Sequence, residues 1–232
     1  MTRIETDFAR RFPPLTPEQS KSVRDRLDLA EDRLLAARVS QAERTLHADI
    51  GRYRDFYLTE FETYHDAQKP IVDRVKRMGS EVDRLVTERL NVIWWGTIGT
   101  GKDQLATWLL RVAASRGHSV RWLSARDYYD ECQAAFSESS THRAVYRTWT
   151  EPTVLCLSDP VFEDGWNQKN SEYLNRIIRR RYDVGRATWL TCNVRDLTHA
   201  RDLFGLDVWD RLIEQSVLLE CKWPSYRTRE KT

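Results

Sequence analysis

A glycine-rich segment between a predicted strand and a predicted helix constrains this sequence more than any other feature. The segment reads Gly-Thr-Ile-Gly-Thr-Gly-Lys over residues 96–102. It follows the apolar run at 91–95 and precedes apolar residues at helical spacing, including Leu105 and Leu109. Glycines in such a loop let backbone N–H groups converge on phosphate oxygens, and the following helix adds the positive end of its dipole. We therefore predict a nucleotide-binding loop formed by Gly96, Thr97, Ile98, Gly99, Thr100, Gly101, Lys102, Asp103 and Gln104.

The composition is that of a folded protein with a sizeable core. Hydrophobic residues make up 41% and charged residues 31% of the 232 residues, which excludes disorder over most of the chain. The formal net charge of +2 provides no overall attraction for nucleic acid, so any such contact must come from local patches. No apolar run approaches the ~20 residues of a membrane span, and the start lacks a signal peptide. The four cysteines form no metal or disulfide pattern, which predicts free thiols and a cytoplasmic protein without membrane contact.

Two regions of different pattern follow one another along the chain. Thr16, Pro17 and Gln19 form a helix start with a capping box, and the helix that follows carries a narrow apolar stripe. This helix docks either on the chain's own core or on a partner protein, and the pattern leaves both interpretations open. We predict a helical partner-binding segment at residues 1–50 and a nucleotide-binding domain at residues 51–232.

From residue 91 onward, short apolar strands alternate with helices. Strands are predicted at 91–95, 120–123, 154–157, 188–192 and 216–220. Helices are predicted at about 66–89, from Leu105 to Ala113, through Tyr128 and Phe136, and from about 170 to 184. This alternation implies a parallel sheet covered by helices on both faces. The predicted fold class is α/β, a P-loop nucleoside triphosphatase core preceded by a small helical N-terminal segment.

The residues expected to bind a metal ion depart from the usual pattern. A hydroxyl normally follows the loop lysine and binds Mg²⁺, together with an aspartate at a strand end. Here Asp103 follows Lys102, and Ser158 ends the strand. One interpretation is an exchange of roles, in which Asp103 and Ser158 bind Mg²⁺ beside ATP. The other is decay of the site, because an extra anion weakens phosphate binding. Asp159 remains the residue best placed to polarise an attacking water.

Several short segments, in order along the chain, carry a family resemblance. They are residues 59–68, the phosphate loop, 124–127, the Ser158-Asp159 strand end, 177–182, 191–193, 210–212 and 223–227. From about residue 52 to residue 227, the chain resembles the DnaC/IstB-type AAA+ ATPases, which are helicase loaders and transposition helpers. The ordered set is more specific than any single motif, and the first segment favours the loader branch. The resemblance implies an AAA+ core with altered Walker A, Walker B and arginine-finger positions.

The resemblance also implies roles for residues outside the loop. Asn193 is expected to orient water near the terminal phosphate, and Arg211 to act in catalysis on the nucleotide of a neighbouring subunit. In the family an arginine often stands four residues before the one matching Arg211, but here Asp207 occupies that position and cannot stabilise developing phosphate charge. The expected catalytic residues are thus Asp159, Asn193 and Arg211, with weak or partner-dependent hydrolysis.

For nucleic acid, the resemblance implies single-stranded DNA bound inside a homo-oligomeric spiral. Cationic and aromatic side chains suited to backbone contact and base stacking occur at Arg126, Tyr128, Arg179 and Arg180. The alternative interpretation is that the tyrosines belong to the core and the arginines to a solvated helix face.

Three functions remain open on the sequence. The favoured one is an ATP-dependent loader that binds a replicative helicase through residues 1–50 and delivers it to single-stranded DNA. The second is a transposition helper of the IstB kind, which recruits a transposase. The third is an adaptor that binds a nucleotide without hydrolysing it.

Overall fold

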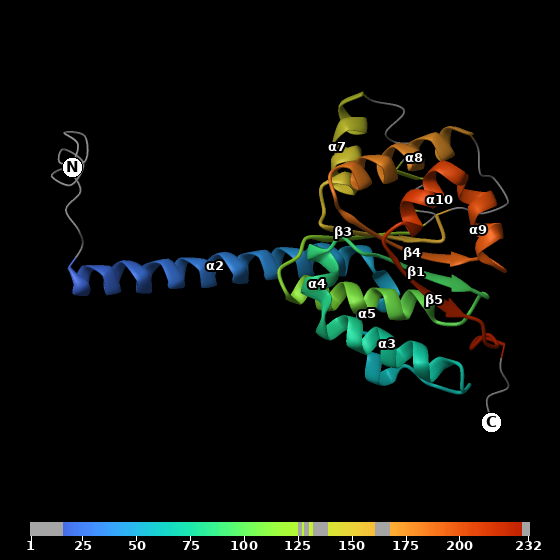
Figure 1. Cartoon of the computed structure of the whole chain (residues 1–232), viewed down its shortest axis with the longest axis horizontal. Coiled ribbons are helices and arrows are strands. Elements are labelled where there is room, and N and C mark those ends of the chain that lie inside the picture. Colours follow the sequence, from blue (N-terminus) through green and yellow to red (C-terminus); the bar gives the residue numbers. More distant parts are fainter. Residues whose placement is uncertain (1–15, 125–126, 128–129, 132–138, 161–167, 229–232) are drawn as a thin grey trace. The chain divides into compact units, whose positions relative to one another are not determined.

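Five parallel strands form the sheet at the centre of the fold (Figure 1). The computed structural model describes residues 16–124, 127, 130–131, 139–160 and 168–228. The strands lie in the order β2-β3-β4-β1-β5, and every neighbouring pair is parallel. Their bounds are Asn91–Gly96 (β1), Val120–Ser124 (β2), Val154–Ser158 (β3), Ala187–Asn193 (β4) and Ser216–Cys221 (β5). The five predicted strands and their parallel arrangement are confirmed.

Each face of the sheet has its own hydrophobic core, because successive residues of a strand point to opposite faces. In β1, Val92 and Trp94 belong to one buried cluster, and Ile93 and Trp95 belong to the other. The first face is covered by α3 (Gln68–Ser80), α4 (Val82–Thr87) and α5 (Lys102–Ser115) (Figure 1). The second face is covered by α7 (Ser139–Thr150), α8 (Gln168–Asp183), α9 (Leu197–Phe204) and α10 (Leu206–Ile213). β1 and β3 are buried throughout, as expected of strands covered on both faces, whereas β5 at the edge of the sheet exposes Glu220.

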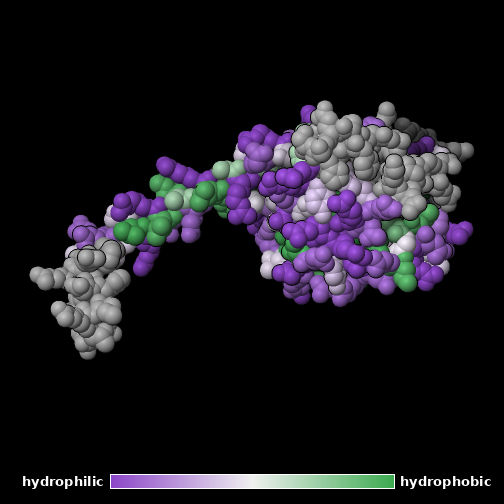
Figure 2. Space-filling model, turned by 90° about the horizontal axis from the view of Figure 1, so that it is seen from above, coloured by the Kyte–Doolittle hydropathy of each residue, from purple (hydrophilic) through white to green (hydrophobic). Residues whose placement is uncertain are grey.

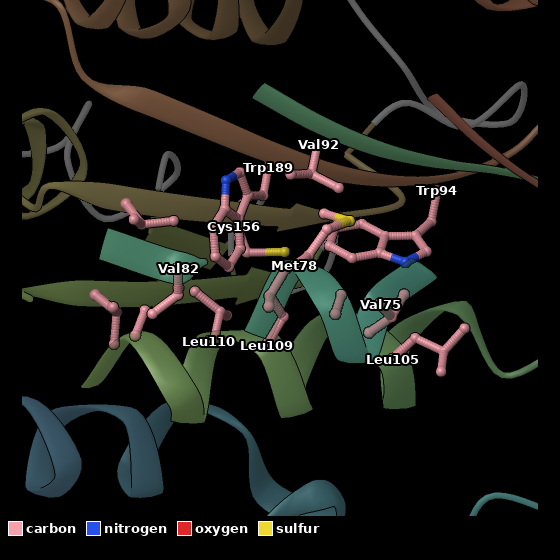
Figure 3. Close-up of a cluster of buried hydrophobic side chains, with 14 of the residues drawn as sticks. Val75, Met78, Val82, Val92, Trp94, Leu105, Leu109, Leu110, Cys156 and Trp189 are labelled. Atoms are coloured by element: carbon pink, nitrogen blue, oxygen red, sulfur yellow. The ribbon is translucent and has the colours of Figure 1, made fainter. Parts of the chain in front are cut away.

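Figure 3 shows part of the first core, where side chains of the sheet meet those of the helices. Trp94 of β1 and Trp189 of β4 meet edge to face, with ring centroids 6.3 Å apart. Leu105 and Leu109 of α5 and Met78 of α3 pack in the same cluster. Each fully buried side chain of this size contributes roughly 2 kcal/mol through transfer from water. This packing fixes α5, and with it the end of the phosphate loop, against the sheet.

The N-terminal helix α2 spans Pro17–Asp49 and begins with the predicted capping box. The Thr16 N–H donates to Gln19 Oε1 over 2.9 Å, and the Gln19 N–H donates to Thr16 Oγ1 over 3.2 Å. The chain divides into two compact units, Met1–Arg38 and Val39–Thr232. The division falls inside the helix, and Ala42 and Leu46, which follow it, are buried in the core of the second unit.

Within the first unit, the described residues expose several leucines to solvent. Leu27, Leu29, Leu34 and Leu35 are between 48% and 65% exposed. Figure 2 shows hydrophobic side chains interspersed with hydrophilic ones along this helix. A helix that exposes leucines in this way offers an apolar surface for binding.

In the part of the chain that the structure describes, no helix is long and apolar enough to cross a membrane.

Several short elements were not predicted from the sequence. They are the 3₁₀ helices η1 (Gly51–Tyr53) and η2 (Leu58–Glu60) and the helices α7, α9 and α10. Helix α7 begins Ser-Ser-Thr-His, a composition typical of loops, which hides it from pattern analysis. Tyr128 and Phe136, which were expected on a helix, lie outside the described residues.

A buried arginine fastens α8 to the sheet. Arg181 is 0% exposed, and its Nη1 donates to the carbonyl oxygens of Trp149 and Pro152, each over 2.9 Å. Its Nε donates to Thr188 Oγ1 over 3.1 Å. Burial, and after it the charge of Arg186, lower the pKa of Arg181 to about 9. The guanidinium thus donates to carbonyl and hydroxyl oxygens from several segments, which is a structural role.

We expect Arg181→Met to lower the free energy of unfolding by roughly 3 kcal/mol, because buried acceptors lose their donor. Arg180→Met, at the exposed neighbouring position, is the matched control and should change the free energy by less than about 0.5 kcal/mol. Urea denaturation followed by circular dichroism measures both. Equal unfolding midpoints for the two variants would contradict the structural role of Arg181.

Candidate nucleotide-binding site

The predicted phosphate loop lies at the carboxyl end of β1 and leads into α5. Gly96 ends β1 and pairs with Asn193 of β4 on one side and with Cys221 of β5 on the other. On the far side of β4, Ser158 of β3 pairs with Thr191. The side chains at these strand ends therefore gather beside the loop, where parallel sheets generally bind ligands.

Two glycines of the loop adopt a left-handed backbone conformation. Gly99 has φ +78° and Gly101 has φ +83°. A Cβ on Gly101 would lie 2.7 Å from the ring of Phe61, and one on Gly99 would lie 2.0 Å from Ser225 Oγ. Both positions therefore require glycine, because of φ and because of close approach. The result is a cradle in which backbone, rather than side chains, faces a phosphate group.

The C-terminal segment is hydrogen bonded to the same loop. Trp223 Nε1 donates to the carbonyl of Thr100 over 3.1 Å, and Thr97 Oγ1 donates to the carbonyl of Trp223 over 3.1 Å. The Tyr226 N–H donates to the carbonyl of Gly99 over 2.9 Å. These bonds fix the shape of the loop from outside the strand–loop–helix motif.

Lys102 is 5% exposed, and its ammonium is held within the loop. Nζ donates to the carbonyl of Thr97 over 2.6 Å and to Asn193 Oδ1 over 2.7 Å. Burial lowers the pKa of Lys102, while the nearby carboxylate of Asp159 acts in the opposite direction. A buried ammonium favours an anionic partner, and a phosphate group at the loop provides one.

The carboxylate of Asp103 accepts hydrogen bonds from three other elements. Its Oδ1 accepts from Ser158 Oγ over 3.0 Å and from Thr191 Oγ1 over 2.7 Å, and its Oδ2 accepts from the Tyr53 hydroxyl over 3.2 Å. Burial, followed by the charge of Asp103, raises the pKa of Tyr53. The two residues that have exchanged chemical type in the sequence are thus in direct contact, so a carboxylate and a hydroxyl are available together at this point.

Asp159 follows Ser158 at the end of β3 and has φ +45°, an uncommon conformation for a residue other than glycine. Its Oδ1 accepts the Asn193 N–H over 2.8 Å, and its Oδ2 accepts from Asn193 Nδ2. Burial, and after it the charge of Asp103, raise the pKa of Asp159 to about 6. A carboxylate with a pKa near neutrality is suited to general-base catalysis at neutral pH. Asn193 links this carboxylate to Lys102.

A cavity of about 580 Å³ lies over the loop, within the usual range for small-molecule sites. Loop residues 98–104 line it together with Asp159 and Asn193, while Gly96 and Thr97 hold the loop to β5. Sequence reasoning missed the remaining lining residues, which are Arg52, Tyr53, Asp55, Phe56, Glu60, Tyr226 and Arg227. Three of these carry aromatic rings that offer faces to a nucleobase. They come from both ends of the domain, and the resemblance at 223–227 was the available signal.

The predicted catalytic Arg211 and the predicted DNA-binding Arg179 lie elsewhere. Both form ion pairs with Asp207, over 2.9 Å for Arg211 and 2.7 Å for Arg179. Hydrogen bonds from Arg211 and then Arg179 lower the pKa of Asp207. Neither arginine lines the cavity over the loop, and Arg180 is exposed on α8. A catalytic role for Arg211 therefore concerns the nucleotide of another chain, and it stays a prediction.

The other predicted DNA-binding residues, Arg126 and Tyr128, lie outside the described residues, as does Cys132. The described cysteines are buried free thiols, as predicted. Burial raises the pKa of Cys192 and of Cys221 to about 12, so neither is a reactive thiolate at neutral pH.

Comparison with known proteins gives a consistent result. The family model of the IstB-like ATP-binding proteins matches residues 8–232. The ATP-binding protein assigned to insertion sequence IS5376 of Geobacillus stearothermophilus is 24% identical over 205 residues, which cover 86% of this chain and 80% of that protein. The replicative helicase loader DnaC of Buchnera aphidicola (subsp. Acyrthosiphon pisum) is 24% identical over 242 residues, which cover 96% of this chain and 95% of the relative.

Solved structures share the same fold at low sequence identity. The crystal structure of the DnaC helicase loader matches with a TM-score of 0.62 at 18% identity, over 74% of this chain and 99% of the other. AMPPCP-bound DnaA from Aquifex aeolicus matches with a TM-score of 0.59 at 20% identity, over 72% of this chain and about half (49%) of the DnaA chain. These neighbours are P-loop domains of the AAA+ class. On this sheet order, phosphate loop and family match, the chain belongs to the IstB-like ATP-binding proteins and is an AAA+ ATPase of the DnaC/IstB type.

Proposed function

We propose that this chain is an ATP-binding loader that delivers a replicative helicase to single-stranded DNA during replication in the cytoplasm. The contact between Asp103 and Ser158 carries the ATP-binding part, because it keeps a carboxylate and a hydroxyl together beside the phosphate loop. The loader part is supported by similarity to a DnaC protein over 96% of this chain.

The site residues fit the triphosphate and the Mg²⁺ that this family implies. Gly99 and Gly101 leave a cradle that a Cβ would fill, and the Lys102 ammonium is buried. Asp103 and Ser158 would hold Mg²⁺, which in such sites takes few protein ligands and several phosphate and water oxygens. No three His, Cys, Asp or Glu side chains gather as a metal site among the described residues. When bound, Mg²⁺ neutralises phosphate charge.

The protein's own groups would divide the remaining work. Lys102 would place positive charge against the outer phosphates. Asp159, held by two hydrogen bonds from Asn193, would accept a proton from the attacking water. Arg211 of a neighbouring chain would stabilise developing charge, but its ion pair with Asp207 must first break. We therefore expect weak hydrolysis in the absence of a partner.

Partner binding is proposed for residues 1–50, with the exposed leucines of the first unit as the contact surface. Helices that expose apolar side chains commonly dock into a groove on another protein. Arg126, Tyr128, Arg179 and Arg180 remain the predicted contacts to single-stranded DNA. Arg179 contributes less than a free cation because Asp207 neutralises it.

A second candidate function is a transposition helper that recruits a transposase. It is favoured by the similarity to an ATP-binding protein of an insertion sequence over 86% of this chain. A nucleotide-binding adaptor without hydrolysis is the third candidate function. The measurement of phosphate release described below for Asp159 tests it.

The exchange of roles predicts compensation between Asp103→Thr and Ser158→Asp. The first change removes the carboxylate and the second places two carboxylates side by side, so each should weaken Mg²⁺-ATP binding by about tenfold or more. The double variant restores one carboxylate and one hydroxyl and should regain most of the affinity. Titration calorimetry with and without Mg²⁺ measures this.

The matched control for this cycle is a hydroxyl–carboxylate pair outside the cavity. Ser124 Oγ donates to Asp127 Oδ2 over 2.5 Å, so Ser124→Asp and Asp127→Thr make the same chemical exchange there. The control variants should bind ATP like the unmodified chain. Strictly additive losses for Asp103→Thr and Ser158→Asp would contradict the exchange of roles.

The raised pKa of Asp159 predicts how hydrolysis depends on pH. The carboxylate is protonated below about pH 6 and cannot accept a proton there, so phosphate release should fall as the pH drops through 6. Asp159→Asn should slow phosphate release by about 100-fold or more while ATP still binds. Steady-state phosphate release between pH 5 and 8, with single-stranded DNA present, tests both statements.

The control for this prediction is Asp196→Asn, which changes an exposed aspartate at the start of α9. It should leave the rate and the pH profile unchanged. A profile without a fall near pH 6, in a chain that does hydrolyse ATP, would contradict Asp159 as the base. No phosphate release with DNA and partner present would favour the adaptor.

Deletion of residues 1–38 should abolish helicase binding and leave ATP affinity unchanged, because the cavity is lined by residues of the second unit. Leu27→Gln with Leu34→Gln should weaken helicase binding in the full chain, whereas Asp25→Gln with Asp32→Gln, at the same spacing, should not. Pull-down with purified helicase measures the effect. Helicase retained by the deleted chain would contradict the loader, and capture of a transposase instead would favour the second candidate.

A further inference from the structure

A second cavity lies at the amino ends of the strands, at the opposite end of β1 and β4 from the phosphate loop. It has a volume of about 250 Å³ and is lined by Asn91 at the start of β1 and Thr188 near the start of β4. The phosphate loop lies at the carboxyl ends of the same strands. Sites for whole small molecules usually measure about 300–1,000 Å³, so this cavity is suited to a single chemical group.

Three arginines contribute to the lining of this cavity. Arg89, Arg186 and Arg211 line it, and Glu214 is the carboxylate on its wall. Glu214 accepts a hydrogen bond from the Tyr182 hydroxyl, and Arg211 is paired with Asp207. Within the described residues, Arg89 and Arg186 form no ion pair. Two guanidinium groups therefore remain available to an anion.

The guanidinium of Arg89 lies against Gly185, in the turn after α8. Arg89 has φ +62°, a conformation uncommon for residues other than glycine. Gly185 has φ +64°, and a Cβ there would lie 2.4 Å from Arg89 Nη1 and 2.5 Å from its Cζ. The guanidinium thus lies flat against the turn after α8, and only glycine leaves room for it.

Arg186 supplies a donor that the fold does not satisfy. Its Nη1 is buried and has no hydrogen-bond partner in the described part of the chain. The neighbouring Arg181 is fully buried and bonds to carbonyl and hydroxyl oxygens rather than to a carboxylate. Buried donors are nearly always paired, so an unsatisfied guanidinium beside a second buried cation favours an anionic ligand.

An aromatic ring and apolar side chains lie beside these cations. Tyr182 is 45% exposed, and Arg211 Cζ lies 5.8 Å from the centroid of its ring. Val184 and Ile213, which neighbour lining residues in sequence, are each 37% exposed. Cationic groups that bind phosphates next to a ring on which a base stacks are the combination used for single-stranded nucleic acid. An acidic protein segment would use the guanidinium groups alone.

We propose that this cavity binds a phosphodiester group of single-stranded nucleic acid through Arg89 and Arg186, with an adjacent base on Tyr182. The proposal rests on the single-stranded DNA binding included in the proposed function. It assigns the contact with nucleic acid to the amino ends of the strands, away from the phosphate loop, and to residues other than Arg179 and Arg180.

The test is fluorescence anisotropy of a labelled oligothymidylate of about 15 nucleotides with the full chain, over a range of salt concentrations. Arg89→Gln with Arg186→Gln should weaken binding by about tenfold. It should also reduce the slope of log affinity against log salt by about 1.4, since each lost phosphate contact contributes about 0.7. Lysine at both positions should restore the slope, because the charge returns.

Two further variants separate this role from loss of folding or of general charge. Arg77→Gln with Arg116→Gln removes two exposed arginines elsewhere. This variant should keep the affinity for the oligonucleotide within about twofold and leave the salt slope unchanged. Tyr182→Leu should weaken binding by about fivefold without changing the salt slope, because stacking is not ionic. Thermal melts of all variants check that they fold.

The outcomes distinguish this inference from the proposed function. Unchanged affinity and slope for the Arg89→Gln, Arg186→Gln variant overturn the inference alone. An unmodified chain that does not bind the oligonucleotide overturns both the inference and the DNA part of the proposed function. A titration with inorganic phosphate tests whether the cavity binds free phosphate instead. Saturating Mg²⁺-ADP keeps the nucleotide site occupied during this titration. If the substitutions weaken phosphate but not oligonucleotide binding, the inference is overturned.

Discussion

Burial of both faces of the parallel sheet is the constraint on which the rest of the structure depends. Val92, Ile93 and Trp94 of β1 are each 0% exposed, so a polar group inside a strand needs a partner close by. The threonines that do occur in β4 have one: Thr188 bonds to Arg181, and Thr191 bonds to Asp103. Among the described residues, Lys102 and Asp159 line the cavity at the carboxyl ends of the strands, and Arg89 and Arg186 line the cavity at their amino ends.

The strands and the phosphate loop could be predicted because their signals are local. An apolar run, a glycine pattern and a helix start can each be recognised without knowing what lies beside them. The contact between Asp103 and Ser158 could not, because it depends on strand order and on the register that places Ser158 beside Thr191. The aromatic side chains Tyr53 and Tyr226 on the cavity wall come from opposite ends of the domain, and no spacing rule connects them.

The arginines of α8 show where composition misleads. Arg179 and Arg180 are exposed, whereas Arg181 is fully buried and structural. Helical periodicity holds a weak signal, since Arg181 lies four residues after the buried Ile177 and shares its face. Arginine is so rarely buried that the helical pattern alone does not justify the prediction of a buried Arg181. The decisive facts are the carbonyl oxygens that converge on its guanidinium, and these come from other segments.

The hydrogen bond between Ser158 and Asp103 also restricts how these two positions can change during evolution. A substitution at one position alone leaves either two carboxylates or two hydroxyls facing each other. The two positions are therefore coupled, and the free-energy cost of a change at one depends on which residue occupies the other. A pair in direct contact tolerates matched substitutions better than single ones, so we expect these two positions to vary together.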